Sequence, residues 1–250
     1  MKHFILSLQF LSRLYLPWMI EGEDDMFARS LKFFPLAGCI IGLLDAGVLW
    51  LLLRVFTPLT AGILVVLFDI ALTGGLHMDG LADTIDGLSS HRSKERMLEI
   101  MKDSRIGTFG VIAIVGEVIV KAALIMELFT HESGWIAYGV IAAVPILSRM
   151  TMVLMIYVSK YAREEGIGGL FFSHKSSICL PAALISGILL SLVSWYYAPV
   201  LLISGLLCAF MIRAICYHKI GGMTGDTLGA TLELEEAVML MAAVLFAAFI

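Results

Sequence analysis

Seven stretches of this chain are apolar and long enough to cross a lipid bilayer, and this restricts the fold more strongly than any other feature. A transmembrane helix needs about 20 mostly apolar residues. The chain is 60% hydrophobic and only 15% charged, whereas soluble domains are about 45–50% apolar and about 25% charged. We therefore predict an all-α, polytopic helical membrane bundle with about seven transmembrane helices, folded as a single domain over residues 1–250. The predicted spans are 36–56, 61–76, 109–130, 135–158, 178–196, 199–217 and 232–250.

The basic residues indicate how these spans are oriented. Because seven spans alternate the two sides of a membrane, the N-terminal segment and the three long polar loops share one side. Of the 17 Lys and Arg residues, Arg54 lies on the opposite side and Lys121 and Arg149 lie inside spans, so 17 minus 3 leaves 14 on the shared side. Positively charged loops remain in the cytoplasm, so we predict a cytoplasmic N-terminus. The loops are predicted at about 77–108, 159–177 and 218–231.

Residues 1–33 precede the first predicted span and are expected to form an N-terminal interfacial amphipathic segment. Phe4, Leu8, Leu11 and Tyr15 fall at helical spacing, as expected for a helix that lies in the membrane interface. The alternative is an ordinary first helix packed on the bundle.

An acidic motif follows the second span, which ends in two glycines. Asp79, Asp83 and Asp86 are spaced i, i+4 and i+7, which places them within about 60° of arc on one helix face. Like charges at this spacing repel each other, and a hard divalent cation with oxygen ligands would offset the repulsion. His77 adjoins the stripe and is a candidate base or ligand. A solvated face with incidental acids is the alternative, but no lysine interrupts the stripe, so we predict metal or phosphate chemistry.

A glycine-rich segment before the last span is a second candidate, because glycine allows backbone to approach a ligand closely. Its residues are Gly222, Thr224, Gly225 and Asp226, of which the last adds a carboxylate. The pattern Gly-Gly-x-x-x-Asp-x-Leu occurs both at 74–81 and at 221–228. Chance and a structural repeat both remain open as explanations.

Basic residues near the same side are candidates for binding an anion. Lys102, Asp103 and Arg105 lie beside the start of the third span, and a helix start with basic neighbours is a suitable anion site. A juxtamembrane cluster on anionic lipid is the equal alternative. Arg149 in the fourth span and Arg163 in the following loop are further candidates.

Some charges lie inside the predicted spans, where they are costly and usually face the protein interior. Glu117 and Lys121 are spaced i, i+4 and are predicted to pair with each other. Glu233 and Glu236 begin the last span, and Glu233 is interpreted as a solvated helix-end residue.

Together these motifs resemble the cobalamin synthase family, also called adenosylcobinamide-GDP ribazoletransferase. The resemblance covers about residues 5–240, and Met78 departs mildly from it where leucine is expected. The matching residues are Gly75 to Asp83 with Asp86, Lys102 to Gly110, Pro145 with Arg149, Tyr161-Ala162-Arg163 with Gly166 and Gly168, and Gly221 to Ala230.

The resemblance implies a magnesium-dependent membrane transferase. α-Ribazole, or its 5′-phosphate, attacks adenosylcobinamide-GDP, GMP leaves, and adenosylcobalamin or its 5′-phosphate forms. The enzyme would lie in the bacterial inner membrane or an archaeal membrane, with its site facing the cytoplasm. The net charge of -4 gives no reason to expect a nucleic acid partner; association with further copies of the chain stays open.

This chemistry agrees with the residues singled out above, because phosphoryl transfer requires positioning and cations at charged oxygens. We therefore predict that Mg²⁺ is held by Asp79, Asp83, Asp86 and Asp226. The basic residues would bind the pyrophosphate, and His77 or one aspartate would accept a proton from the attacking hydroxyl.

Two other functions fit parts of the pattern. A secondary transporter would have broken helices and intramembrane charges, but its polar residues should lie at mid-bilayer between matched repeats. An intramembrane aspartyl protease would use two aspartates, which Asp79 and Asp226 could imitate. A stripe of three acids argues against such a dyad, in which two carboxylates share one proton.

Overall fold

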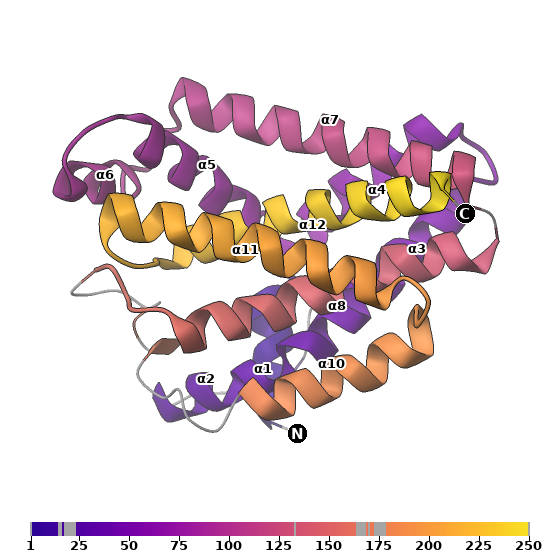
Figure 1. Ribbon diagram of the computed structural model, residues 1–250, viewed down its shortest axis with the longest axis horizontal. Helices are drawn as coiled ribbons and strands as arrows, with labels where there is room; N and C mark the ends of the chain where they lie inside the picture. The colour runs from indigo at the N-terminus through magenta and orange to yellow at the C-terminus, as the bar shows by residue number, and fades with distance from the viewer. Residues whose placement is uncertain are drawn as a thin grey trace.

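The chain folds into a bundle of long helices that run along one common direction (Figure 1). This computed structural model describes residues 2–14, 17, 24–132, 134–163, 169, 171–172 and 179–249. The helices are α1 (Lys2–Leu11), α2 (Asp24–Ser30), α3 (Phe34–Leu52), α4 (Pro58–Thr73), α5 (Leu76–Ser89), α6 (Lys94–Ile100), α7 (Thr108–His131), α8 (Trp135–Val158), α10 (Cys179–Val193), α11 (Ala198–Ile220) and α12 (Gly225–Ala248), with a short 3₁₀ turn at Leu31–Phe33 before α3. Within these ranges the only β-type pairing is an isolated bridge between Tyr161 and Met223.

The all-α membrane fold is confirmed. Four helical segments are long and apolar enough to cross a membrane: Met26–Leu52, which ends in α3, and α7, α8 and α11. A fifth crossing requires α4 and α5 together, and these two are bent by 95° at a short break. The described residues thus give four or five spans by length and apolar character, where seven were predicted, because α10 is shorter and α12 carries several acidic residues.

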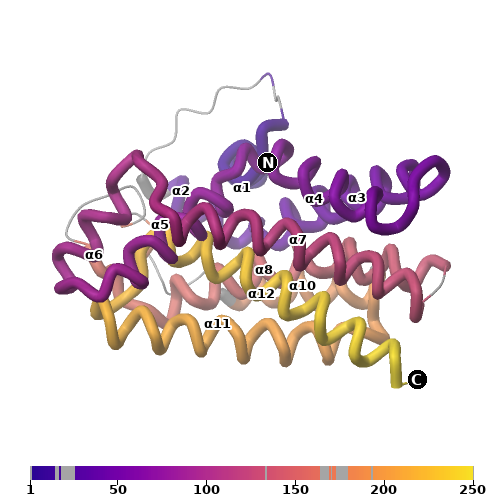
Figure 2. Tube along the Cα trace, turned by 90° about the horizontal axis from the view of Figure 1, so that it is seen from above, coloured from indigo at the N-terminus to yellow at the C-terminus, as the bar shows by residue number. Residues whose placement is uncertain are grey.

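The outward faces of the bundle are apolar, as lipid contact requires. Leu180, Leu184, Ile188 and Leu192 form an exposed stripe along α10, and α7 and α11 carry similar stripes. By contrast, α8 is mostly buried and contacts α3, α10, α11 and α12. Figure 2 shows α3 and α4 along one side of the molecule and α11 along the opposite side, with α8 and α12 between them. The exposed apolar stripes therefore belong to an outer layer of helices around a central α8.

Polar elements gather at one end of this bundle, which we call the polar end. It comprises α5, α6, the start of α7, the end of α8 and the α11–α12 turn, all on the left of Figure 1. The turns between α3 and α4 and between α7 and α8 lie at the opposite end, together with the C-terminus. Successive spans therefore alternate direction, as the sequence predicts.

Two of the three predicted polar loops are shorter than expected, and most of the third, at 159–177, lies outside the described residues. Most of 77–108 forms α5 and α6, and the loop predicted at 218–231 is wrong, because only residues 221–224 separate α11 from α12. Two local signals set these ends. Gly221 takes a left-handed conformation (φ 77°) that ends α11, and the Thr224 and Thr227 side chains cap the start of α12 reciprocally.

The N-terminal helix packs on the protein. Ile5, Leu6, Leu8 and Leu11 are buried, and α1 contacts α2 and α3. The apolar face predicted to enter the membrane interface is thus covered by the bundle, which corresponds to the alternative of an ordinary packed helix. Tyr15, part of that predicted pattern, lies outside the described residues, as do Gly166 and Gly168.

Candidate active site at the polar end

The acidic motif is positioned by a sharp break between α4 and α5. Gly74 (φ 70°) and Gly75 (φ 71°) both adopt the left-handed conformation, which residues with a Cβ rarely adopt. The chain turns there by 95°, and α5 begins at Leu76 with Asp79 in its first turn. The paired glycines of the sequence motif therefore direct the acidic helix.

The second acidic segment reaches α5 because α5 and α12 cross at glycines. A Cβ on Gly80 would lie 2.8 Å from the carbonyl oxygen of Asp226, and one on Gly229 would lie 3.2 Å from the Cα of His77. Such short distances mean that the two backbones touch, as small residues allow between membrane helices. This crossing brings Asp226, from the far end of the sequence, beside the α5 motif.

An acid cluster results, which we define as Asp79, Asp83 and Asp226. Asp83 is half-buried and lies within electrostatic reach of Asp79, Asp226 and Asp86. Asp79 and Asp226 also line a cavity of about 250 Å³. The cluster concentrates negative charge beside this cavity, a setting that favours a cationic ligand.

His77 is adjacent to this cluster and lines the same cavity. Its side chain is 2% exposed, and neither ring nitrogen has a hydrogen-bond partner among the described residues. Buried polar groups are normally hydrogen-bonded. The imidazole is therefore available to a molecule that enters the cavity.

Arg163 supplies the positive charge nearest the acid cluster. Its Nη2 donates to Oδ2 of Asp226 over 2.5 Å, and both side chains are largely buried. Backbone bonds hold this region in place, since the Met223 N–H donates to the Lys160 carbonyl and the Ala162 N–H donates to the Met223 carbonyl, each over 2.9 Å. The segment after α8 is thus tied to the α11–α12 turn.

Asp86, the third acid of the stripe, has a different set of partners. Its Oδ2 accepts from the Gly107 N–H over 2.7 Å and its Oδ1 accepts from the Gly110 N–H over 2.8 Å. Both amides lie at the start of α7, where backbone N–H groups have no acceptor within the helix and a carboxylate is favourable. The structure therefore gives Asp86 a helix-capping position as well as a place beside the cluster.

The glycine-rich candidates have structural contacts of their own. A Cβ on Gly222 would lie 2.5 Å from the Lys160 carbonyl oxygen, so this glycine permits the backbone pairing. Thr224 is fully buried and caps α12, accepting from the Thr227 N–H over 3.2 Å. Gly225 lines the cavity and is the member of this group placed to approach a ligand.

Lys102, Asp103 and Arg105 lie at the surface before α7. The Arg105 guanidinium binds Asp103 through Nε over 3.0 Å and Nη2 over 2.7 Å, and its side chain is 87% exposed. These hydrogen bonds hold the pKa of Asp103 down at about 2. Lys102 is exposed as well. Unlike Arg163, none of the three forms an ion pair or hydrogen bond with the acid cluster within the described ranges.

Arg149 lies in the bundle interior. It is 1% exposed and pairs with Glu236 on α12, while Lys121 on α7 donates to Glu233 over 2.6 Å and to Glu236 over 2.9 Å. The pairing of Lys121 with Glu117 is confirmed at 3.4 Å. The interpretation of Glu233 as a solvated helix-end residue is wrong: it is 3% exposed.

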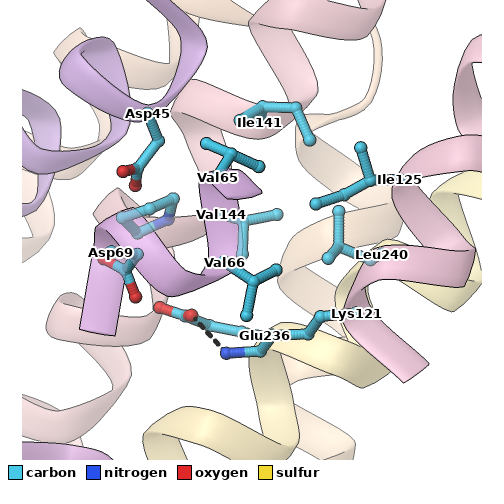
Figure 3. Close-up of a pocket in the computed structure, with 11 residues that line it drawn as sticks. Asp45, Val65, Val66, Asp69, Lys121, Ile125, Ile141, Val144, Glu236 and Leu240 are labelled. Atoms are coloured by element: carbon cyan, nitrogen blue, oxygen red, sulfur yellow. Dashed lines mark hydrogen bonds and ion pairs between the residues drawn. The ribbon is translucent and has the colours of Figure 1, made fainter. Parts of the chain in front are cut away.

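We call these side chains the buried charge network: Glu117, Lys121, Arg149, Glu233 and Glu236. Figure 3 shows Lys121 and Glu236 joined beside a cavity of about 50 Å³ that Asp45 and Asp69 also line. Sequence reasoning finds each charge, since charges inside spans seek partners. Apart from the Glu117–Lys121 pair it does not find the partners, because Glu233 and Glu236 on α12 lie far along the chain from Lys121 on α7 and Arg149 on α8.

The donor chemistry of the acid cluster suits Mg²⁺, which usually takes one or two carboxylates and completes its shell with water and substrate phosphate oxygens. Among the residues that the structure describes, no group of three His, Cys, Asp or Glu side chains is close enough to enclose a metal ion. The cluster therefore offers part of a coordination shell.

The sequence of this chain is similar to those of one known protein family. The family model described as CobS, cobalamin-5-phosphate synthase, matches residues 3–244. Similar proteins named adenosylcobinamide-GDP ribazoletransferase occur in Clostridioides difficile strain 630 (36% identical; 96% of each chain), Clostridium novyi strain NT (37% identical; 98% of each chain) and Escherichia coli K12 (36% identical; 96% of this chain and 98% of the relative). No solved structure matches the chain. The match extends over nearly all of the chain and includes both acidic segments, and the chain therefore belongs to the cobalamin-5-phosphate synthase family.

Proposed function

We propose that this chain is a membrane transferase that joins α-ribazole, or its 5′-phosphate, to adenosylcobinamide-GDP and releases GMP. The observation that carries the proposal is the crossing of α5 and α12, which sets Asp79 and Asp83 beside Asp226 and Arg163. Phosphoryl transfer depends on positioning and on neutralising the charged oxygens. Carboxylates for a cation and a guanidinium for phosphate are the groups that this chemistry needs.

The reaction forms one phosphorus–oxygen bond and breaks another. A ribose hydroxyl of α-ribazole attacks the phosphorus on the cobinamide side of the pyrophosphate. The bond from that phosphorus to the bridging oxygen breaks, and GMP leaves with its electron pair. The hydroxyl proton passes to a base, for which His77 and Asp79 are the candidates because both line the cavity.

One or two of the carboxylates of Asp79, Asp83 and Asp226 would bind Mg²⁺, and substrate oxygens and water would complete its shell. Bound there, the ion supplies neutralisation of the pyrophosphate charge. Asp86 is part of the predicted ligand set, yet both of its oxygens accept from amides of α7. We therefore infer that the main role of Asp86 is to hold α7 in position relative to α5, and that binding the metal is a secondary role.

Arg163 would bind the pyrophosphate, because it is the cation paired with the cluster. Its Nε is buried without a partner among the described residues, so it has a donor left for a phosphate oxygen. Arg149 is already engaged with Glu236 and would act through the fold.

We place the enzyme in the bacterial inner membrane or an archaeal membrane, with the polar end in the cytoplasm. The distribution of Lys and Arg supports this orientation. A transporter is not favoured, because Lys121 and Arg149, the basic residues inside the spans, are already paired with Glu233 and Glu236.

The test is GMP release by the purified, detergent-solubilised protein. It receives adenosylcobinamide-GDP and α-ribazole 5′-phosphate with Mg²⁺ or with EDTA. We expect GMP and a cobalamin product in equal amounts, and only with Mg²⁺. A folded protein that forms no product would overturn the proposed function. Turnover in EDTA would contradict the proposed requirement for Mg²⁺.

A further inference from the structure

The cavity beside the acid cluster is chemically divided. At one side it is lined by His77, Asp79 and Asp226. The rest of its wall is mostly apolar, with three phenylalanines from three separate segments of the chain. The apolar side chains that line it are those of Phe10, Phe34, Leu76, Met152, Ile156, Phe171 and Leu228.

The three phenylalanine rings contact one another and form a continuous aromatic wall. The ring centroids of Phe10 and Phe171 are 5.2 Å apart at 62°, and those of Phe10 and Phe34 are 6.0 Å apart and nearly parallel at 19°. Phe34 and Phe171 complete the triangle at 6.2 Å. Such a wall is suited to a flat aromatic ligand, which gains edge and face contacts with the rings.

The reactants of the proposed function offer three groups that could enter. A corrin ring with its side groups is far too large for about 250 Å³. Guanine is flat, but among the phenylalanines its polar edge would face an apolar wall without hydrogen-bond partners, and buried polar groups left unpaired are costly. The base of α-ribazole is a bicyclic aromatic ring with little polar surface, and it suits both the size and the apolar wall.

The polar side of the cavity fixes the direction of such a ligand. Both ring nitrogens of His77 are without partners among the described residues, and its side chain is almost wholly buried. A ribose hydroxyl is the part of α-ribazole that can hydrogen-bond there. With the base among the phenylalanines, the sugar would lie next to Asp79 and Asp226, where attack on phosphorus must begin.

We propose that the cavity walled by Phe10, Phe34 and Phe171 is the α-ribazole subsite, with the aromatic base on the phenylalanines and the ribose directed to His77 and Asp79. This inference rests on the proposed function and assigns the nucleophile's binding site.

The first test measures the KM of each substrate separately. Phe10→Ala and Phe171→Ala should raise the KM for α-ribazole about 10- to 100-fold, as expected for loss of a buried aromatic contact, and leave the KM for adenosylcobinamide-GDP within about 2-fold. Phe129→Ala is the matched control, because Phe129 belongs to an aromatic pair with Tyr138 near the α7–α8 turn. A rise in the KM for adenosylcobinamide-GDP instead, or no rise at all, would overturn the subsite.

A second test uses the unaltered protein, so it decides the matter even where a variant fails to fold. Free 5,6-dimethylbenzimidazole should inhibit competitively against α-ribazole and not against adenosylcobinamide-GDP. Competition with adenosylcobinamide-GDP, or no inhibition up to its solubility limit, would contradict the assignment. If the unaltered protein releases no GMP from its substrates, the proposed function has failed; if it turns over and only the inhibition pattern is wrong, the subsite alone has failed.

Discussion

Two groups of charged side chains occupy different levels of α12, and they differ in how their charges are balanced. In the buried charge network, Glu233 and Glu236 are paired with Lys121 and Arg149 from two other helices. In the acid cluster, three carboxylates share one cation, Arg163, within the part of the chain that the structure describes. The first group is largely balanced by the protein itself, whereas the second has an excess of negative charge.

The difference separates charges that hold the fold from charges that await a ligand. In a bilayer an unpaired charge is costly, so a network without access to water must be completed by other side chains. At the polar end the acids border a cavity, and a substrate with its cation can complete them there. The same helix therefore ties the bundle together at one level and contributes to the proposed reaction at another.

The largest effect on stability is expected in the buried charge network. Glu236→Gln removes the carboxylate shared by Arg149, Lys121 and Ser148 and leaves two buried cations facing Glu233. Removing one partner of a buried ion pair costs about 3–5 kcal/mol. We expect a much lower thermal midpoint in detergent. Glu127→Gln, in an exposed pair with His131, is the control, and equal midpoints for both variants would contradict the structural role.

The largest effect on activity is expected in the acid cluster. Asp83→Asn should lower the turnover number about 100- to 1,000-fold, the scale seen when a group that stabilises transition-state charge is removed. Its thermal midpoint should stay level or rise, because a like-charge repulsion is relieved. A turnover number near that of the wild type would show that Asp83 has no role in the reaction. Unfolding of the variant would show that Asp83, like the buried charge network, stabilises the fold.

Asp86 combines the two roles, because it caps α7 and also lies beside the acid cluster. Asp86→Ala leaves the Gly107 and Gly110 amides without their acceptor and should destabilise the protein by about 1–2 kcal/mol, as the loss of a helix cap does. Turnover should fall less than in Asp83→Asn. A loss of turnover as large as that of Asp83→Asn, with unchanged stability, would show that Asp86 acts mainly on the metal.

The smallest effect is expected at the surface pair before α7. Arg105→Gln breaks an exposed ion pair with Asp103 and should change stability by less than about 1 kcal/mol. We expect a smaller rise in the KM for adenosylcobinamide-GDP than Arg163→Gln produces. The opposite order would place the pyrophosphate at the start of α7 and not beside Asp226.

Much of this organisation could be predicted from local pattern. The helical membrane fold follows from apolar segments whose backbone can be satisfied in lipid only within helices or barrels. The glycine pattern shared by 74–81 and 221–228 has a local counterpart, since Gly74 and Gly221 both end helices in the left-handed conformation and both aspartates follow in the next first turn. The end of the polar loop at 218–231 was missed because Thr224 and Thr227 form a cap without an acidic residue.

The sequence by itself determined the helices, their alternation and the acidic stripe on α5, because each depends on residues only a few positions apart. The tertiary structure alone decided which charges meet. Asp226 joins Asp79 and Asp83 because Gly80 and Gly229 let two helices touch, and Glu233 is buried because Lys121 lies opposite it. Such contacts join residues more than 100 positions apart, so they depend on how the helices cross, which periodicity along one helix does not specify.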